Sequence, residues 1–219
     1  MTSTDVTLVV LAKAPRPGTA KTRLSPPFSL KEAAVIARAA LVDTFDAVCR
    51  TRARRKVLVL SGEAGPWVPR GVDVLPQRGG GLDERLAAAF EDVAGPALLI
   101  GMDTPQVTPA LLNSCIRVLL DEKHDAAIGL AEDGGFWAVG LRNPERSAFV
   151  GVPMSTATTG EHQMRRLREL GLRVGMLPSL RDVDDVEGAI AVADLAPGGA
   201  FAMAVREAMR PRATALQAP

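Results

Sequence analysis

The chain has 219 residues, of which 47% are hydrophobic and 23% charged, and its 26 basic residues nearly balance its 25 acidic ones. This composition is typical of globular proteins, and a net charge of +1 argues against binding of nucleic acid polymers, which calls for a basic excess. With six Phe, two Trp and no Tyr, the chain has few residues from which to build a base-stacking RNA surface.

Neither a membrane segment nor a disulfide framework is expected. No apolar run approaches the roughly 18 residues of a membrane span, and the N-terminal stretch lacks the basic region of a signal peptide. We therefore expect a cytoplasmic protein with no membrane partner. The two cysteines, Cys49 and Cys115, are too few for a disulfide framework, and each is expected to be a small buried residue on a helix.

Apolar runs and helical periodicity alternate along the chain. The β-branched run at residues 6–12 predicts a buried strand that ends at the loop KAPRPG. Ser29 followed by Glu32 predicts a capping box that starts a helix over residues 29–50. Further strands are predicted at 56–60, 72–75, 97–100, 126–130, 136–141 and 173–177, and further helices at 82–93, 108–120, 155–170 and 186–195.

This alternation predicts an α/β fold of three layers, α/β/α, in which helices cover both faces of a mostly parallel central sheet. Residues 1–210 are expected to form a single domain, and residues 211–219 a loose C-terminal tail. In such sheets, ligands bind at the carboxyl ends of the strands. The loops that follow the strands are therefore the segments in which to look for chemistry.

The loop after the first strand is strongly basic. Its sequence AKAPRPGTAKTRL contains Gly18 for backbone freedom and no acid, and its four cations are Lys13, Arg16, Lys21 and Arg23. Four cations at the carboxyl end of a strand favour the binding of several phosphates. A solvated basic loop is the alternative, and the Walker A pattern is absent from the loop.

A glycine-rich stretch, QRGGGL, precedes the helix predicted at 82–93. The backbone N–H groups of Gly80 and Gly81 can approach a ligand closely at such a helix start. A flexible connection is the alternative explanation for the same composition.

Two acidic segments follow later strands. Asp103, in GMDTP, comes directly after a buried strand, and a carboxylate opposite a phosphate-binding loop suits Mg²⁺, which prefers one or two carboxylates together with phosphate oxygens and water. Asp182 and Asp184 follow the last predicted strand and share a face if that segment is extended. Capping of the next helix is the alternative for both segments.

The stretch EDGGFWAVGL places Asp133 and two glycines in a tight turn before a strand that begins at Phe136. A ligand-binding turn and a plain hairpin with aromatic residues in the core both fit this pattern.

These motifs together resemble a bacterial family. The stretches AKAPRPGTAKTRL, GMDTP, EDGGFWAVGL, VPMSTATTGEHQMRRLRELGL and DVDD occur in the order seen in a glycosyltransferase-like family of unknown function that is linked to arsenosugar biosynthesis. The resemblance covers about residues 5–195 and implies the GT-A, or nucleotide-diphospho-sugar transferase, fold. The same ground plan resembles that of 2-phospho-L-lactate guanylyltransferase, in which a similar loop follows the first strand.

The resemblance also implies roles for particular residues. Binding of the nucleotide is implied for Leu11, Ala12, Lys13, Arg16, Gly18, Lys21, Arg23, Gln77, Gly80, Gly81 and Leu82. The metal, Mg²⁺ or Mn²⁺, is expected on Asp103, Asp184 and Asp182. The acceptor half of the cleft is implied for Asp133, Gly134, Gly135, Phe136, Ser155 and Thr156. The residues expected to be catalytic are Lys21, Arg23 and Asp103.

A metal-dependent nucleotidyltransferase is the leading hypothesis. An acceptor phosphate would attack the α-phosphorus of a nucleoside triphosphate and release pyrophosphate, with positioning and charge neutralisation supplying most of the rate. Four cations suit a triphosphate, and the single carboxylate of Asp103 contrasts with the Asp-x-Asp of many glycosyltransferases.

Two alternatives stay open. Glycosyl transfer from a nucleotide sugar is the second hypothesis, and a non-catalytic nucleotide-binding domain is the third. The expected partners are a nucleoside triphosphate or nucleotide sugar and a small-molecule acceptor, and a homodimer is left open.

Overall fold

The strands and helices alternate along the chain as the periodicity predicts. The computed structural model describes residues 4–210. Its strands are β1 (Thr4–Lys13), β2 (Ala53–Ser61), β3 (Asp73–Pro76), β4 (Ala97–Gly101), β5 (Ala126–Leu130), β6 (Phe136–Leu141) and β7 (Val174–Met176). Its α-helices are α1 (Leu30–Arg50), α2 (Leu82–Val93), α3 (Pro109–Leu120), α4 (Thr159–Glu169), α5 (Val186–Leu195) and α6 (Ala200–Met209), and short 3-10 helices lie at Thr22–Leu24 and Arg146–Ala148.

One strand runs against the rest of the sheet. The seven strands lie in the order β3-β2-β1-β4-β6-β5-β7. Every neighbouring pair is parallel except those that involve β6, which is antiparallel to both β4 and β5. The mostly parallel sheet is therefore confirmed. The hairpin from β5 also brings the first residue of β6, Phe136, to the edge at which the other strands end.

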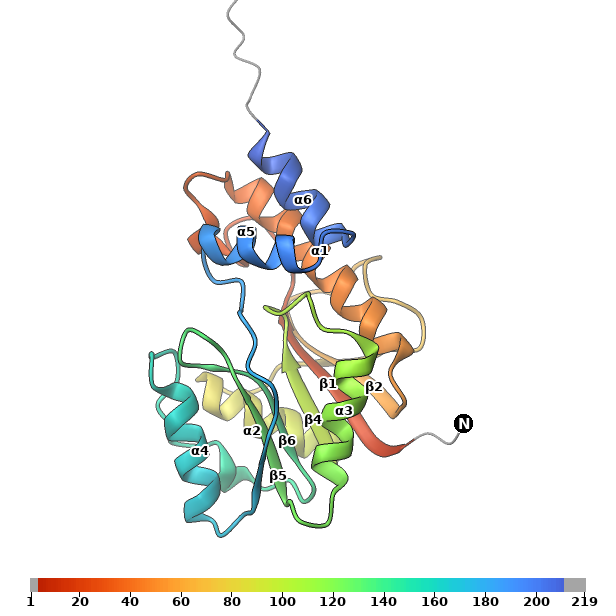
Figure 1. Ribbon diagram of the computed structural model, residues 1–219, viewed down its shortest axis with the longest axis vertical. Helices are drawn as coiled ribbons and strands as arrows, with labels where there is room; N and C mark the ends of the chain where they lie inside the picture. Colours follow the sequence, from red (N-terminus) through yellow and green to blue (C-terminus); the bar gives the residue numbers. More distant parts are fainter. Residues whose placement is uncertain (1–3, 211–219) are drawn as a thin grey trace, which may run out of the picture.

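Helices cover the sheet on both faces (Figure 1). On one face Leu8 and Val10 of β1 pack with α1 and α3 in one buried cluster, and on the other face Val9 packs with α2 and α4. The predicted capping box starts α1, because the Ser29 Oγ accepts from the Glu32 N–H at 3.2 Å and the Glu32 carboxylate accepts from the Ser29 N–H at 2.7 Å. The three-layer α/β fold is thus confirmed.

The C-terminal helices α5 and α6 lie beside α1 and away from the sheet (Figure 1). Phe201 of α6 is 1% exposed and belongs to a third buried cluster with side chains of α1 and α5. Leu24 and Val183 join the same cluster. Leu24 belongs to the basic loop and Val183 lies between Asp182 and Asp184, so this cluster anchors both the basic loop and the acidic segment.

Three details differ from the sequence predictions. The helix predicted at 155–170 begins at Thr159, because Ser155 has φ +59°, in the left-handed region that an α-helix does not contain. Helix α6 was not predicted. Cys115 is buried on α3 as expected, whereas the prediction for Cys49 is wrong, since it is exposed near the end of α1.

The tail predicted at residues 211–219 lies outside the described residues. Among the helices that the structure describes, none combines the length and apolar character needed to cross a membrane.

Phe201→Ala should lower the free energy of unfolding by about 3–5 kcal/mol, because the buried ring would leave a cavity between α1, α5 and α6. Met203→Ala on the same helix, where the side chain is 59% exposed, is the matched control and should change it by less than about 0.5 kcal/mol. Urea unfolding followed by circular dichroism measures both. A separate early transition for α5 and α6 would contradict the expectation that residues 1–210 form one domain.

Candidate functional site

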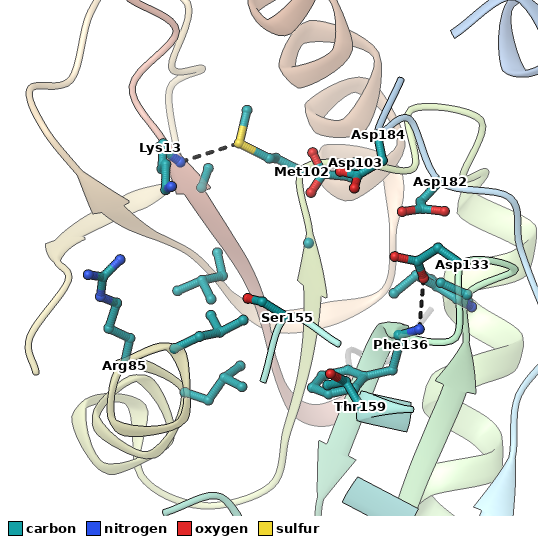
Figure 2. Close-up of a pocket in the computed structure, with 18 of the residues that line it drawn as sticks. Lys13, Arg85, Met102, Asp103, Asp133, Phe136, Ser155, Thr159, Asp182 and Asp184 are labelled. Carbon is teal, nitrogen blue, oxygen red and sulfur yellow. Dashed lines mark hydrogen bonds between the residues drawn. The ribbon is translucent and has the colours of Figure 1, made fainter. Parts of the chain in front are cut away.

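A cleft of about 830 Å³ opens where β1 and β4 end and β6 begins. Six segments line it: β1 with the basic loop, the glycine-rich stretch with α2, the segment after β4, the β5–β6 turn, residues 155–159 and residues 182–184. Figure 2 shows two basic residues, Lys13 and Arg85, across the cleft from four acidic residues, namely Asp103, Asp133, Asp182 and Asp184.

The Gln77 side chain connects the start of the glycine-rich stretch to the central sheet. Its side-chain nitrogen donates to the Ala12 carbonyl at 2.8 Å and to the Val59 carbonyl at 3.2 Å, so it bridges the ends of β1 and β2. This nitrogen is engaged with the protein itself. Gln77 still lines the cleft, together with its neighbours Leu11, Ala12, Gly80, Gly81 and Leu82.

Two predicted cations of the basic loop are paired with acids. The Lys21 ammonium forms an ion pair with Asp103 and donates to the Val183 carbonyl, and only 5% of its side chain is exposed. Arg23, 73% exposed, pairs with Asp184. Lys21 also has φ +53°, a left-handed backbone that costs energy for a residue with a Cβ. The loop therefore turns sharply at Lys21 and directs the ammonium toward the acids.

Two other residues of the loop lie outside the cleft. Arg16 pairs with Glu63 at 2.5 Å on the surface and is absent from the cleft lining. Gly18 is exposed with φ +79° and does not line the cleft either. The structure thus gathers three of the four predicted cations, Lys13, Lys21 and Arg23, around the cleft.

Lys13 and Arg85 line the cleft, and neither forms an ion pair with another described residue. The Lys13 N–H donates to the Met102 sulfur at 3.3 Å, which packs the end of β1 against the segment after β4. Arg85 lies one turn into α2, after Gly81 at the N-cap. Arg85 was missed from the sequence, although helical spacing places it on the same face as Leu82.

Four carboxylates meet on the opposite side of the cleft. One oxygen each of Asp133, Asp182 and Asp184 lies within 4.8 Å of the others, so these three could hold a metal ion. Asp103, paired with Lys21, is the fourth. The Val183 N–H donates to the Asp103 carbonyl at 2.8 Å and so attaches the segment of Asp182 and Asp184 to the end of β4. This group of three therefore contains Asp133, which was not predicted to bind the metal, and leaves out Asp103, which was.

Asp182 is half-buried beside the other carboxylates. Burial and the neighbouring charge of Asp133, with smaller effects of Asp184 and Asp103, raise its pKa from 3.8 to about 6. A cation bound among these oxygens would remove the repulsion. Carboxylate oxygens are the ligands that Mg²⁺ and Mn²⁺ prefer, so the donor set fits such an ion.

The remaining wall joins the β5–β6 turn to residues 155–159. The Asp133 carboxylate accepts from the Gly135 N–H at 2.7 Å, and the Gly160 N–H donates to the Gly134 carbonyl at 2.8 Å. Gly134 has φ +89°, and a Cβ there would lie 1.8 Å from the Ala157 carbonyl oxygen, so only glycine fits. Gly134 itself does not line the cleft, but its close packing holds Ala157 against the turn.

All but three of the residues predicted for the site line this one cleft, and the three exceptions are Arg16, Gly18 and Gly134. Besides Arg85, two buried polar residues of the lining were not predicted from the sequence, Thr104 and Thr159. Single threonines beside a turn give no sequence signal of their own.

Asp182→Asn should change how stability depends on pH in the metal-free protein. Because folding raises this pKa, the group stabilises the fold below its unfolded pKa, near pH 4, and that stability is lost as the pH rises through about 6. From pH 4 to 7 the wild type should therefore lose about 1–2 kcal/mol relative to the variant, after allowance for partial exposure.

Urea unfolding in chelator at several pH values measures this difference. Adding Mg²⁺ or Mn²⁺ at pH 7 should stabilise the wild type more than Asp182→Asn. A pH profile identical for the two proteins would show that burial and the neighbouring acids do not raise the pKa of Asp182.

Comparison with solved structures identifies the fold. One similar crystal structure is that of a candidate nucleotide-diphospho-sugar transferase from Desulfovibrio desulfuricans G20. It matches with a TM-score of 0.82 and 25% identity, over 92% of this chain and 94% of that chain. CMP:2-keto-3-deoxy-manno-octonic acid synthetase in complex with CTP is similar with a TM-score of 0.58 and 12% identity, over 89% of this chain and 99% of that chain. Rv0371C of Mycobacterium tuberculosis H37Rv in complex with manganese is similar with a TM-score of 0.50 and 21% identity, over 88% and 100%.

These likenesses confirm the nucleotide-diphospho-sugar transferase fold. Comparison with curated proteins finds no match. Residues 35–156 match a family described as "Uncharacterized protein conserved in bacteria (DUF2064)", and this stretch includes Asp103, Asp133, Ser155 and Thr156. Because the match spans more than half of the chain, the protein belongs to the bacterial DUF2064 family.

Proposed function

We propose that this protein is a metal-dependent transferase that uses a nucleotide, and that it transfers the nucleotidyl group with release of pyrophosphate. The observation that carries the proposal is the separation of charge across one cleft, in which Lys13 and Arg85 face four carboxylates at the ends of parallel strands. A metal–triphosphate complex contains both signs of charge, and each sign meets its opposite here.

The nucleotide would lie along the basic side. The base would contact the wall of Leu11, Ala12 and the glycine-rich stretch, where the N-terminus of α2 opens into the cleft. Lys13 and Arg85 would contact the phosphates, because both cations line the cleft without an ion-pair partner among the described residues.

Asp103, Asp182, Asp184 and Asp133 are the residues that would hold Mg²⁺ or Mn²⁺. Bound there, the ion would neutralise charge on the phosphates during transfer. The fold neighbour crystallised with manganese supports a metal in this fold, and the neighbour crystallised with CTP supports a nucleotide.

The chemical step is a displacement at phosphorus. An acceptor oxygen forms a bond to the α-phosphorus, and the bond between that phosphorus and the bridging oxygen of pyrophosphate breaks, with pyrophosphate keeping the electron pair. A phosphate acceptor attacks through an oxygen that is already ionised at neutral pH, since its second pKa is about 6, so the step needs no carboxylate as a base. Lys21 and Arg23 would assist by stabilising the charge of the leaving pyrophosphate.

Glycosyl transfer from a nucleotide sugar is the second candidate, and one observation favours it. The wall of Asp133, Ser155 and Thr156 carries hydroxyl groups and a carboxylate, which can hydrogen-bond a sugar. In that reaction the leaving group would be a nucleoside diphosphate, so the products distinguish the two candidates.

Asp103→Asn should abolish most pyrophosphate release. The wild type, supplied with Mg²⁺, each nucleoside triphosphate and a set of small acceptors, should release pyrophosphate, and the variant should be at least about 100-fold slower because one ligand charge is lost. Coupled measurement of pyrophosphate gives both rates. Asp194→Asn, an exposed carboxylate on α5, is the matched control.

Products decide between the candidates. Transfer from a nucleotide sugar without pyrophosphate release would replace nucleotidyl transfer with glycosyl transfer. Nucleotide binding without either reaction would identify a non-catalytic nucleotide-binding domain.

Lys21→Ala should weaken triphosphate binding by about tenfold to a hundredfold, which is the usual contribution of a charge-assisted contact. The affinity for the corresponding nucleoside should stay unchanged, because a nucleoside has no phosphate. Calorimetric titration measures both ligands, with Lys31→Ala, an exposed lysine of α1, as the control. Equal triphosphate affinity in wild type and Lys21→Ala would remove the phosphate role of the loop.

A further inference from the structure

The segment at residues 146–151 is packed against α2. Phe149 is fully buried and stacks on Phe90 of this helix, with the ring centroids 4.9 Å apart. Two residues later, the Gly151 N–H donates at 2.9 Å to the carboxylate of Asp83, which lies in the first turn of α2. This hydrogen bond lowers the pKa of Asp83, so the carboxylate accepts as an anion at neutral pH.

Asp83 adjoins the side of the cleft that is assigned to the nucleotide, although it does not line the cleft itself. The two residues before it, Gly81 and Leu82, do line the cleft. One carboxylate oxygen of Asp83 bonds to Gly151, and a Cβ on Gly81 would collide with the other. The carboxylate therefore lies between the start of α2 at the cleft and the turn at Gly151.

Helix α4 holds the same segment from its other side. Arg166 donates to the Val150 carbonyl at 2.8 Å, and the fully buried Gln163 donates to the Ala148 carbonyl at 2.7 Å. These carbonyl groups are thus bound by α4, while the N–H of Gly151 is bound by α2. The segment therefore connects the two helices.

Residues 152–159 lead from this segment to the acceptor side of the cleft, which Ser155 and the two residues after it line. The stretch is held at both ends, at Gly151 by Asp83 and at Gly160 by the β5–β6 turn, to which the Gly160 N–H donates at 2.8 Å. Between these ends Ser155 has φ +59°, a strained backbone that persists only where the surrounding structure holds it. Loss of either attachment would let the stretch move.

We propose that Asp83 is a positioning residue for group transfer, which fixes the acceptor side of the cleft relative to the helix that faces the nucleotide. It touches neither ligand and acts through the Gly151 N–H. Transfer needs the attacking oxygen in line with the phosphorus and about 3–3.5 Å from it, so a shift of the acceptor side would slow the reaction while the nucleotide stays bound. The inference rests on the proposed function for the roles of the two sides, but the attachment itself can be measured without any reaction.

Asp83→Ala should raise the KM for the acceptor about tenfold and change the Kd for the triphosphate less than about twofold, because only the acceptor side loses its attachment. Asp83→Asn keeps a side-chain oxygen that can accept from the Gly151 N–H, so its KM should stay close to that of the wild type. Pyrophosphate release with the acceptor varied gives KM, and calorimetric titration gives Kd. An acceptor KM that Asp83→Ala leaves unchanged, or that Asp83→Asn raises equally, would overturn the inference.

Hydrogen exchange gives a readout that needs no substrate. In the ligand-free full chain, deuterium uptake over residues 152–158 should be at least about tenfold faster in Asp83→Ala than in the wild type or Asp83→Asn, while α3 stays unchanged. Asp83→Ser, whose hydroxyl is one bond shorter than the carboxylate and still suits a helix start, serves if Asp83→Ala does not fold. Uptake that is equal in wild type and variant would overturn the inference.

Glu91→Ala is the matched control. It removes the exposed ion pair between Glu91 and Arg146, which joins the other end of α2 to the same segment. Exposed ion pairs contribute little, so this change should alter neither the uptake over residues 152–158 nor the acceptor KM.

The two readouts separate this inference from the proposed function. Faster uptake in Asp83→Ala, with a wild type that releases no pyrophosphate from any triphosphate, would contradict nucleotidyl transfer and leave the attachment by Asp83 established. Pyrophosphate release with the same acceptor KM in wild type and Asp83→Ala would support nucleotidyl transfer and overturn the inference.

Discussion

The crowding of four carboxylates at one edge of the sheet is the constraint on which the cleft depends. In the ligand-free protein Lys21 balances Asp103 and Arg23 balances Asp184, while burial and the charge of Asp133 keep the pKa of Asp182 high. These two ion pairs leave the charges of Asp133 and Asp182 uncompensated. The rest of the fold must therefore hold the four acids close together despite their repulsion. The third hydrophobic cluster does this, because Val183 is fully buried between Asp182 and Asp184.

The helices α5 and α6 therefore help to position the residues of the cleft. Their cluster with α1 also buries Leu24, which directly follows Arg23 in the basic loop. Cationic and acidic segments that are about 160 residues apart in sequence are thus anchored in one apolar cluster. Packing at a distance from the cleft sets the geometry within it.

The sequence predicts the repeating elements well because each has a local cause. The Ser29–Glu32 capping box and the apolar runs of β1 and β4 act over a few residues. Helix α6 was missed because its cap is tertiary, since the Asp43 carboxylate of α1 accepts from the N–H groups of Ala200 and Phe201 at 2.9 and 2.8 Å. The late start of α4 likewise depends on the left-handed backbone of Ser155, which apolar spacing does not report.

The site follows the same division between local and long-range causes. The ends of the strands predict which loops meet, so the placement of Lys13 and Asp103 at the cleft could be inferred. The direction of a long side chain such as that of Arg16 depends instead on a partner far away in sequence, here Glu63. The observed ion pairs have a further consequence for binding. On the function proposed above, a metal bound by Asp103 and Asp184 would free Lys21 and Arg23 to contact phosphates, so each ligand would favour binding of the other. Metal and nucleotide would then bind in this cleft cooperatively.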